Sequence, residues 1–155
     1  MRRIHTLFLV PVLALVLLLA AGCGTKEPAP VDSNAVRQTL TGKKWYCQSM
    51  FDRDVKGDAP LTLEFKDDGT VSGNGGCNDF TGTYTLAEDS LSFGPLATTK
   101  KDCGGAAAEQ EYTYLSFLAT IIRVKVDGDE LELYKENQPA PMLFTTSEGG
   151  GFSLW

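Results

Sequence analysis

The feature that most restricts how this chain can fold is a change of pattern at Gly42. After it, short runs of alternating apolar and polar residues are separated by turn-forming residues. In the run 61–65, LTLEF, the two leucines and Phe65 point to one side of an extended chain, while Thr62 and Glu64 point to the other. A period of two is typical of strands that bury one face. We expect strands at 44–51, 61–65, 70–73, 80–86, 90–93, 123–126, 130–134 and 142–145.

Two triplets supply tight turns between these runs, DDG at 67–69 and DGD at 127–129. Acidic residues beside glycine favour two-residue hairpin connections, so the flanking strands should be antiparallel. The carboxylates of both triplets are therefore interpreted as solvated turn residues rather than as a catalytic acid and base pair.

One segment breaks the strand pattern. In 106–120, AAAEQEYTYLSFLAT, the residues Ala108, Tyr112, Leu115 and Ala119 recur at spacings of four, three and four, which predicts a helix. Further apolar residues widen its face, which we expect to lie on the sheet: Tyr114, Phe117, Leu118 and Ile121. Glu109 and Glu111 near its start suit the positive end of the helix dipole.

A shorter helix is expected at 33–40, capped by Asp32 or Ser33 and stopped by Gly42. The order of several strands, one long helix and a closing hairpin predicts an α+β fold of about seven to eight antiparallel strands. Residues 42–145 are long enough for one compact domain.

The N-terminus has the pattern of a bacterial lipoprotein signal peptide. Arg2 and Arg3 precede an uncharged run, 7–21, which is shorter than the about 20 apolar residues of a membrane-spanning helix. The run ends LLLAAGC, which resembles a lipobox and predicts removal of residues 1–22 and lipid attachment at Cys23. Because Gly24 rather than Asp follows, the pattern resembles sorting to the outer membrane, with the domain facing the periplasm. Residues 23–41 are expected to form a lipid-anchored tether and 146–155 a C-terminal tail.

Cleavage there changes the charge of the protein and its inventory of reactive groups. The loss of Arg2 and Arg3 takes Lys and Arg from 14 to 12, so the balance against 20 acidic residues is −8. Nucleic acid attracts basic faces, so we expect no nucleic-acid partner. The only histidine, His5, is also removed, and with it Ser-His and Cys-His nucleophile pairs and a common zinc ligand. We therefore expect no enzyme activity, no metal and no cofactor.

The glycines around Asn74, at 73, 75 and 76, could suggest a phosphate-binding loop. The GxxxxGK[ST] spacing is absent and no helix follows at once. We interpret the glycines as permitting a bulge or a positive φ where a strand turns sharply. Asn78 is expected to satisfy nearby backbone groups with its side chain.

Four blocks in order resemble the META domain family, which includes the HslJ heat-shock lipoproteins. They are GGCN followed by Gly82 and Tyr84, then FGPLATT with Cys103, then EQE before the long helix, and finally DGDELELY; Trp45 fits the aromatic residue that opens the domain. The resemblance spans about residues 42 to 144. It implies an antiparallel β half-barrel with one helix packed on it, similar to lipoprotein pilots of secretion systems, and it brings no activity.

The resemblance also bears on the cysteines. With Cys23 lipidated, Cys47, Cys77 and Cys103 remain, so at most one internal disulfide can form. Because Cys77 and Cys103 both lie in family blocks, we expect these two to be joined, which leaves Cys47 as a buried thiol or a partner in an intermolecular bond. Pairing of Cys47 with either of the others stays open.

Two functions remain as hypotheses. The first is an envelope-anchored lipoprotein that supports envelope integrity, or stress and drug tolerance as in the family, through protein or lipid contacts. The second is a carrier of lipid or a small amphiphile, or a pilot-like assembly factor.

Overall fold

The computed structural model describes residues 31–56 and 59–149. The predicted signal peptide, residues 23–30 of the predicted tether with Cys23, and residues 150–155 of the predicted tail lie outside the described residues. The elements run in the order α1 (Ser33–Leu40), β1 (Lys44–Met50), β2 (Arg53–Asp54), β3 (Thr62–Phe65), β4 (Thr70–Asn74), β5 (Asp79–Ala87), β6 (Ser90–Phe93), β7 (Ala97–Thr98), α2 (Gly105–Leu118), β8 (Ile121–Asp127), β9 (Glu130–Lys135) and β10 (Met142–Thr145).

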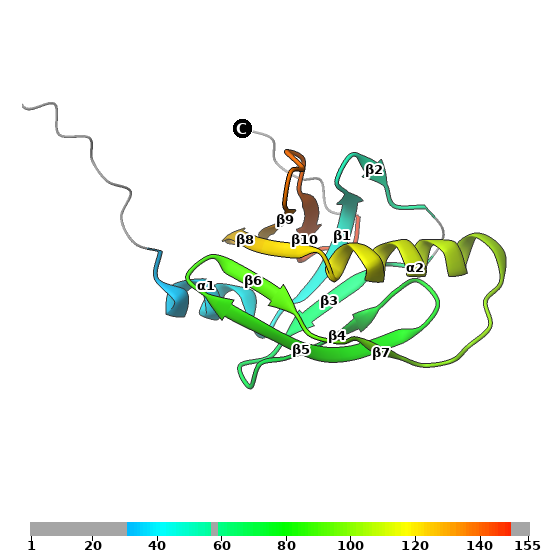
Figure 1. The fold of residues 1–155 in the computed structure, drawn as a ribbon, viewed down its shortest axis with the longest axis horizontal. Coiled ribbons are helices and arrows are strands. Elements are labelled where there is room, and N and C mark those ends of the chain that lie inside the picture. Colours follow the sequence, from blue (N-terminus) through cyan, green and yellow to red (C-terminus); the bar gives the residue numbers. More distant parts are fainter. Residues whose placement is uncertain (1–30, 57–58, 150–155) are drawn as a thin grey trace, which may run out of the picture.

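The sheet closes on itself. Neighbouring strands pair antiparallel in the order β10-β9-β8-β6-β5-β4-β3-β1, and β10 also pairs with β1. Met50 lies opposite Met142 and Cys47 opposite Phe144 across that closing pair. Between β6 and β8 the ladder is reduced to one residue pair, Ser90 with Arg123. The result is an eight-stranded antiparallel barrel (Figure 1).

The predicted α+β fold with a helix packed on an antiparallel barrel is confirmed. Both triplets predicted as turns, 67–69 and 127–129, connect hairpin strands. The closing pair of β1 and β10 makes the ring complete where a half-barrel was expected. Two strands were not predicted, β2 beyond β1 and β7 beside β5, because two residues are too few to show an alternating pattern.

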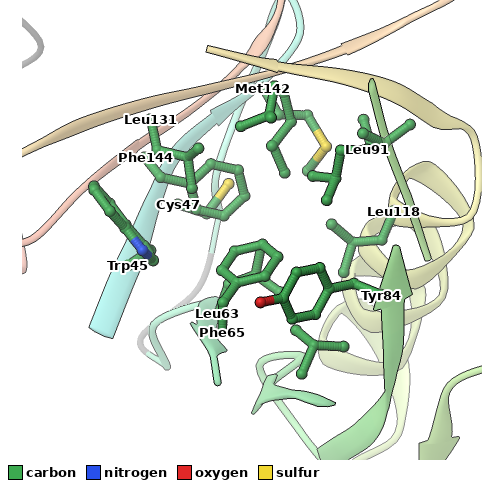
Figure 2. Packing of buried hydrophobic residues seen from close by; sticks show 14 of the residues in the cluster. Trp45, Cys47, Leu63, Phe65, Tyr84, Leu91, Leu118, Leu131, Met142 and Phe144 are labelled. Atoms are coloured by element: carbon green, nitrogen blue, oxygen red, sulfur yellow. The ribbon is translucent and has the colours of Figure 1, made fainter. Parts of the chain in front are cut away.

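The barrel interior is filled by side chains from nearly every strand. Trp45, Leu63, Phe65, Phe144 and Leu131 are all at most 1 % exposed, and Figure 2 shows them converging on the same space. Apolar area removed from water on this scale is the main stabilising contribution to the fold. A ligand as large as a lipid chain would therefore have to displace core side chains to enter.

Helix α1 lies against the barrel through two anchors. Its last residue, Leu40, accepts a hydrogen bond from the Trp45 indole Nε1 at 2.9 Å. Arg37 donates to the Tyr84 hydroxyl at 3.1 Å, and that hydroxyl donates to the Lys66 carbonyl at 2.8 Å. The Asp32 carboxylate caps the helix by accepting from the Asn34 N–H, as the sequence predicted.

Helix α2 contacts the core through Tyr114 and Leu118, which are fully buried. The Tyr114 hydroxyl donates to the Thr62 carbonyl at 3.0 Å, and its ring lies 6.1 Å from that of Phe80. The predicted contact face was partly wrong, because Tyr112 is 76 % exposed. Spacing alone did not distinguish the side of the helix that carries Tyr112 from the side that carries Tyr114. Within the described part of the chain, no helix is long and apolar enough to cross a membrane.

Candidate functional site

The turn between β4 and β5 is organised by the side chain of Asn78, which is 6 % exposed. Its amide oxygen accepts from the Thr99 hydroxyl and from the Lys101 N–H, each at 2.7 Å. Its amide nitrogen donates to the Lys101 carbonyl at 3.3 Å and to Glu111 Oε1 at 3.0 Å. The prediction that Asn78 satisfies nearby backbone groups is confirmed.

Glu111 extends this network from α2. Its Oε2 accepts from the Asn78 backbone N–H at 2.5 Å, so both carboxylate oxygens are used by one residue. Because the carboxylate is engaged in positioning the turn, it is a poor candidate for moving a substrate proton. The sequence assigned Glu111 only to the helix dipole, since nothing local links it to a residue 33 positions earlier.

The glycines of this turn were predicted to permit a bulge or a positive φ, which Gly76 shows; Gly73 and Gly75 instead allow close packing. A Cβ on Gly73 would lie 2.0 Å from the Thr62 carbonyl oxygen, and one on Gly75 would lie 2.8 Å from the Glu111 side chain. Gly76 has a φ of +94°, which favours glycine. The turn thus has no room for side chains at these positions.

The disulfide joins Cys77 to Cys103, with the Cα atoms 6.0 Å apart. It fastens the segment that precedes α2 to the same turn that Asn78 holds. Cys47 is a free, buried thiol, and burial raises its pKa well above the usual range. A thiol that stays protonated is a weak nucleophile.

The carboxylates of the turns are not gathered into a shared cleft. Asp68 accepts hydrogen bonds from the hydroxyl and the backbone N–H of Thr70. The hydroxyl bond contributes most, and the backbone bond less, to lowering the pKa of this exposed carboxyl. Asp129 pairs with Lys43 at 3.1 Å at the other turn. Across residues 31–56 and 59–149, no three His, Cys, Asp or Glu side chains are grouped as metal ligands.

A hollow of the described residues lies outside the barrel, between the β1–β2 hairpin and the first turns of α2. This groove has a volume of about 790 Å³. One wall is formed by Met50, Arg53, Asp54, Lys56, Ala59 and Gly76, and the other by Ala106, Ala107, Glu109, Gln110 and Thr113. We call it the β2–α2 groove. Its volume is within the range of about 300–1,000 Å³ found for ligand sites.

An aromatic and cationic cluster adjoins the groove. Phe51 and Phe117 meet edge to face with ring centres 5.0 Å apart. The Arg53 guanidinium lies 5.7 Å from the Phe117 ring centre, and the Lys135 ammonium lies 4.5 Å from that of Phe51. Phe51 has a φ of +62°, a costly conformation for a bulky residue that is associated with functional segments.

Sequence reasoning missed the groove entirely. Its walls come from residues 50–56, from Ala59 and Gly76, and from residues 106–113, which no periodic pattern connects. The available signals were weak: the small side chains of Ala106 and Ala107 at the helix start, and a run of charges after Phe51.

Comparisons with known proteins agree with the fold. A family model described as the META domain matches residues 38–148. A solution NMR structure of a protein from Burkholderia xenovorans is 30 % identical, with a TM-score of 0.61, and the match covers 78 % of this chain and 92 % of that one. That relative therefore folds with little beyond the matching domain. No curated protein matches the chain.

Two further solved structures are similar in fold. A second NMR structure is 22 % identical, with a TM-score of 0.56 and coverage of 70 % of this chain and 92 % of that one. A crystal structure of a DUF4847 family protein from Bacteroides vulgatus is 14 % identical, with a TM-score of 0.56 and coverage of 72 % and 97 %. Because the family model covers most of the chain and the barrel agrees, the chain belongs to the META domain family.

Proposed function

We propose that this META domain protein is a non-enzymatic binding protein of the bacterial envelope, lipid-anchored at Cys23 to the periplasmic face of the outer membrane. It supports envelope integrity, or tolerance of stress and drugs, by holding a partner on its outer surface. The proposal combines the lipobox expected from the sequence with the position of the β2–α2 groove.

The main support for the proposal is that side chains fill the interior of the barrel, while the β2–α2 groove lies on its outer surface. Tyr114 and Leu118 of α2 pack into the same core as Phe144, whereas the groove lies outside the barrel, between the β1–β2 hairpin and α2. A partner can reach such a surface without disturbing the core. This favours contacts with another molecule over carriage of a lipid inside the barrel.

The chemistry of the acidic residues also supports a binding role. Glu111 is engaged by Asn78, and Asp68 and Asp129 are engaged within turns. Acid and base catalysis by carboxylates needs two of them facing one cleft. The groove holds Asp54 and Glu109 on opposite walls, and both side chains are exposed to water.

Photo-crosslinking in intact envelopes tests the proposal. A photoreactive residue placed at Thr113, in the groove, should give a specific crosslinked product, while the same residue at Lys66, at the β3–β4 turn, should not. Replacement of Cys23 by serine should move the protein from the membrane fraction to the soluble fraction. The proposal fails if Thr113 gives no product beyond that seen at Lys66.

A further inference from the structure

The sheet has one exposed edge beside the groove. Among the described strands, β2 pairs only with β1, through Ser49 with Asp54 and Met50 with Arg53, and ends the path of the sheet. Both residues of β2 are exposed. An edge strand presents backbone N–H and carbonyl groups that another extended chain can pair with.

A side chain of α2 already binds the backbone just beyond this edge. The Lys56 backbone N–H, two residues after β2, donates to the Gln110 Oε1 at 2.6 Å. Within the hairpin, Met50 and Arg53 flank the two-residue turn, and Ser49 and Asp54 form the next pair. Because hydrogen-bonded and non-hydrogen-bonded pairs alternate and the pair beside a two-residue turn is the hydrogen-bonded one, the backbone groups of Asp54 point away from β1. The Gln110 amide oxygen accepts from Lys56 as a partner strand's carbonyl would.

The groove suits a peptide better than an acyl chain. Its lining combines the apolar side chains of Met50, Ala59 and Ala106 with polar groups that can donate or accept hydrogen bonds. An acyl chain cannot form hydrogen bonds with the polar groups of the groove, whereas a peptide backbone has donors and acceptors that can pair with them.

Charge at the β2 rim indicates what the peptide should carry. Lys43, Lys44, Lys101 and Lys125 each lie within 4 Å of a carboxylate. Arg53, which lies over Phe117, and Lys56 have no such carboxylate among the described residues. Glu109 on the opposite wall is exposed and belongs to α2. Asp54 lies on the same rim, but an acidic side chain beside Arg53 would meet a guanidinium that no described carboxylate pairs with within 4 Å.

We propose that the β2–α2 groove binds an extended peptide segment of a protein partner, which pairs with the outer edge of β2. Alternate apolar side chains of the segment face Met50 and Ala59, and an acidic side chain lies beside Arg53. Binding displaces Gln110 from the Lys56 N–H. The inference rests on the proposed binding function and names its site and partner class.

Selection from a displayed library of random 12-residue peptides tests this on the domain 31–149, since a solved relative folds with little beyond it. We expect enriched peptides that alternate apolar and acidic residues and that shift the amide resonances of Asp54 and Lys56. Failure to enrich any peptide over an empty support overturns the inference, as does enrichment only of peptides that shift other regions.

Variants make the test specific to the edge. Asp54→Pro removes an edge N–H and should weaken binding at least 10-fold, while Asp54→Asn keeps it and should not. Gln110→Ala removes the competing amide and should tighten binding several-fold. Arg53→Glu should weaken binding about 10-fold, and Lys66→Glu, the same charge change at the β3–β4 turn, should leave it unchanged. Unaltered affinity in both Asp54→Pro and Gln110→Ala overturns the inference.

The two proposals can fail separately. Crosslinking at Thr113 without any edge-binding peptide would leave a groove-binding protein that does not use strand pairing. If peptides bind the β2 edge but Thr113 gives no crosslinked product in the envelope, the proposed function is contradicted. The inference that the groove can bind an extended peptide would still hold.

Discussion

Asn78 donates two hydrogen bonds to Glu111, one to each carboxylate oxygen, at 2.5 Å from its backbone nitrogen and 3.0 Å from its side-chain nitrogen. The pair links the β4–β5 turn to α2. Because Asn78 also binds Thr99 and Lys101, one buried side chain holds three segments that are distant in sequence.

Asn78→Ala should lower the free energy of unfolding by about 3 kcal/mol, because it leaves hydrogen-bonding groups of Thr99, Lys101 and Glu111 without their partner and disconnects two segments from the turn. Urea denaturation measures the loss. Asn34→Ala, on the exposed surface of α1, should stay within about 0.5 kcal/mol of the parent protein. A loss below about 1 kcal/mol for Asn78→Ala would show that the network is dispensable.

Replacing both Cys77 and Cys103 by alanine should lower the free energy of unfolding by about 3.5 kcal/mol. This is the chain-entropy value for a loop of this size, which here spans a separation of 26 residues. The parent protein should lose a similar amount when a reductant is added, while the double variant should not respond. A reductant effect of equal size in the double variant would mean that the lost stability does not come from the bond between Cys77 and Cys103.

Gly73→Ala should destabilise the protein by about 3 kcal/mol or more, because the new Cβ meets a backbone oxygen of β3 and the Phe80 ring. Gly104→Ala is the matched control: its Cβ meets nothing within 4 Å, although a φ of +57° adds strain. That strain costs about 1–2 kcal/mol. Thermal unfolding ranks the two variants, and equal losses would mean that β3 and β4 can separate to admit a methyl group.

Stability should fall at alkaline pH. Burial raises the pKa of Cys47 and of Tyr114, so the folded protein keeps both protons at a pH where the unfolded chain loses them. The unfolded state then binds fewer protons, and its free energy falls relative to the folded state as pH rises. From about pH 8.5 the thiol should contribute up to about 1.4 kcal/mol per pH unit, and from about pH 10 the phenol adds a second slope.

Urea denaturation between pH 7 and 10 measures this loss. Cys47→Ala should be less stable at pH 7 because of the cavity it leaves, but its stability should be nearly level between pH 8.5 and 10. A parent protein whose stability is level over that interval would contradict the assignment of a buried, protonated thiol.

The eight longer strands and α2 could be predicted because each carries a periodic pattern several residues long. The alternation in 61–65 placed Leu61, Leu63 and Phe65 in the core correctly. Thr62 was expected to point outward but is also buried, because its hydroxyl accepts from the Asn74 N–H and Tyr114 covers its carbonyl. A pattern of apolar residues does not show such polar burial.

The β2–α2 groove could not be predicted, for a related reason. It depends on the distance between a two-residue strand and the start of α2, and on one bond from Lys56 to Gln110. Neither residue has an unusual neighbour in sequence. Closure of the barrel was likewise hidden, since pairing of β1 with β10 depends on the curvature of the whole sheet rather than on either strand alone.

The pairing of β1 with β10 also has a kinetic consequence. The first and last strands of the domain are neighbours, so contacts that join the two ends of the chain must form before the ring is complete. Chains with many such distant contacts fold slowly, because loop-closure entropy is lost before the contacts form. Until Met142–Thr145 docks, β1 and β9 each keep an unpaired edge, and the nascent domain is most exposed to self-association during that interval.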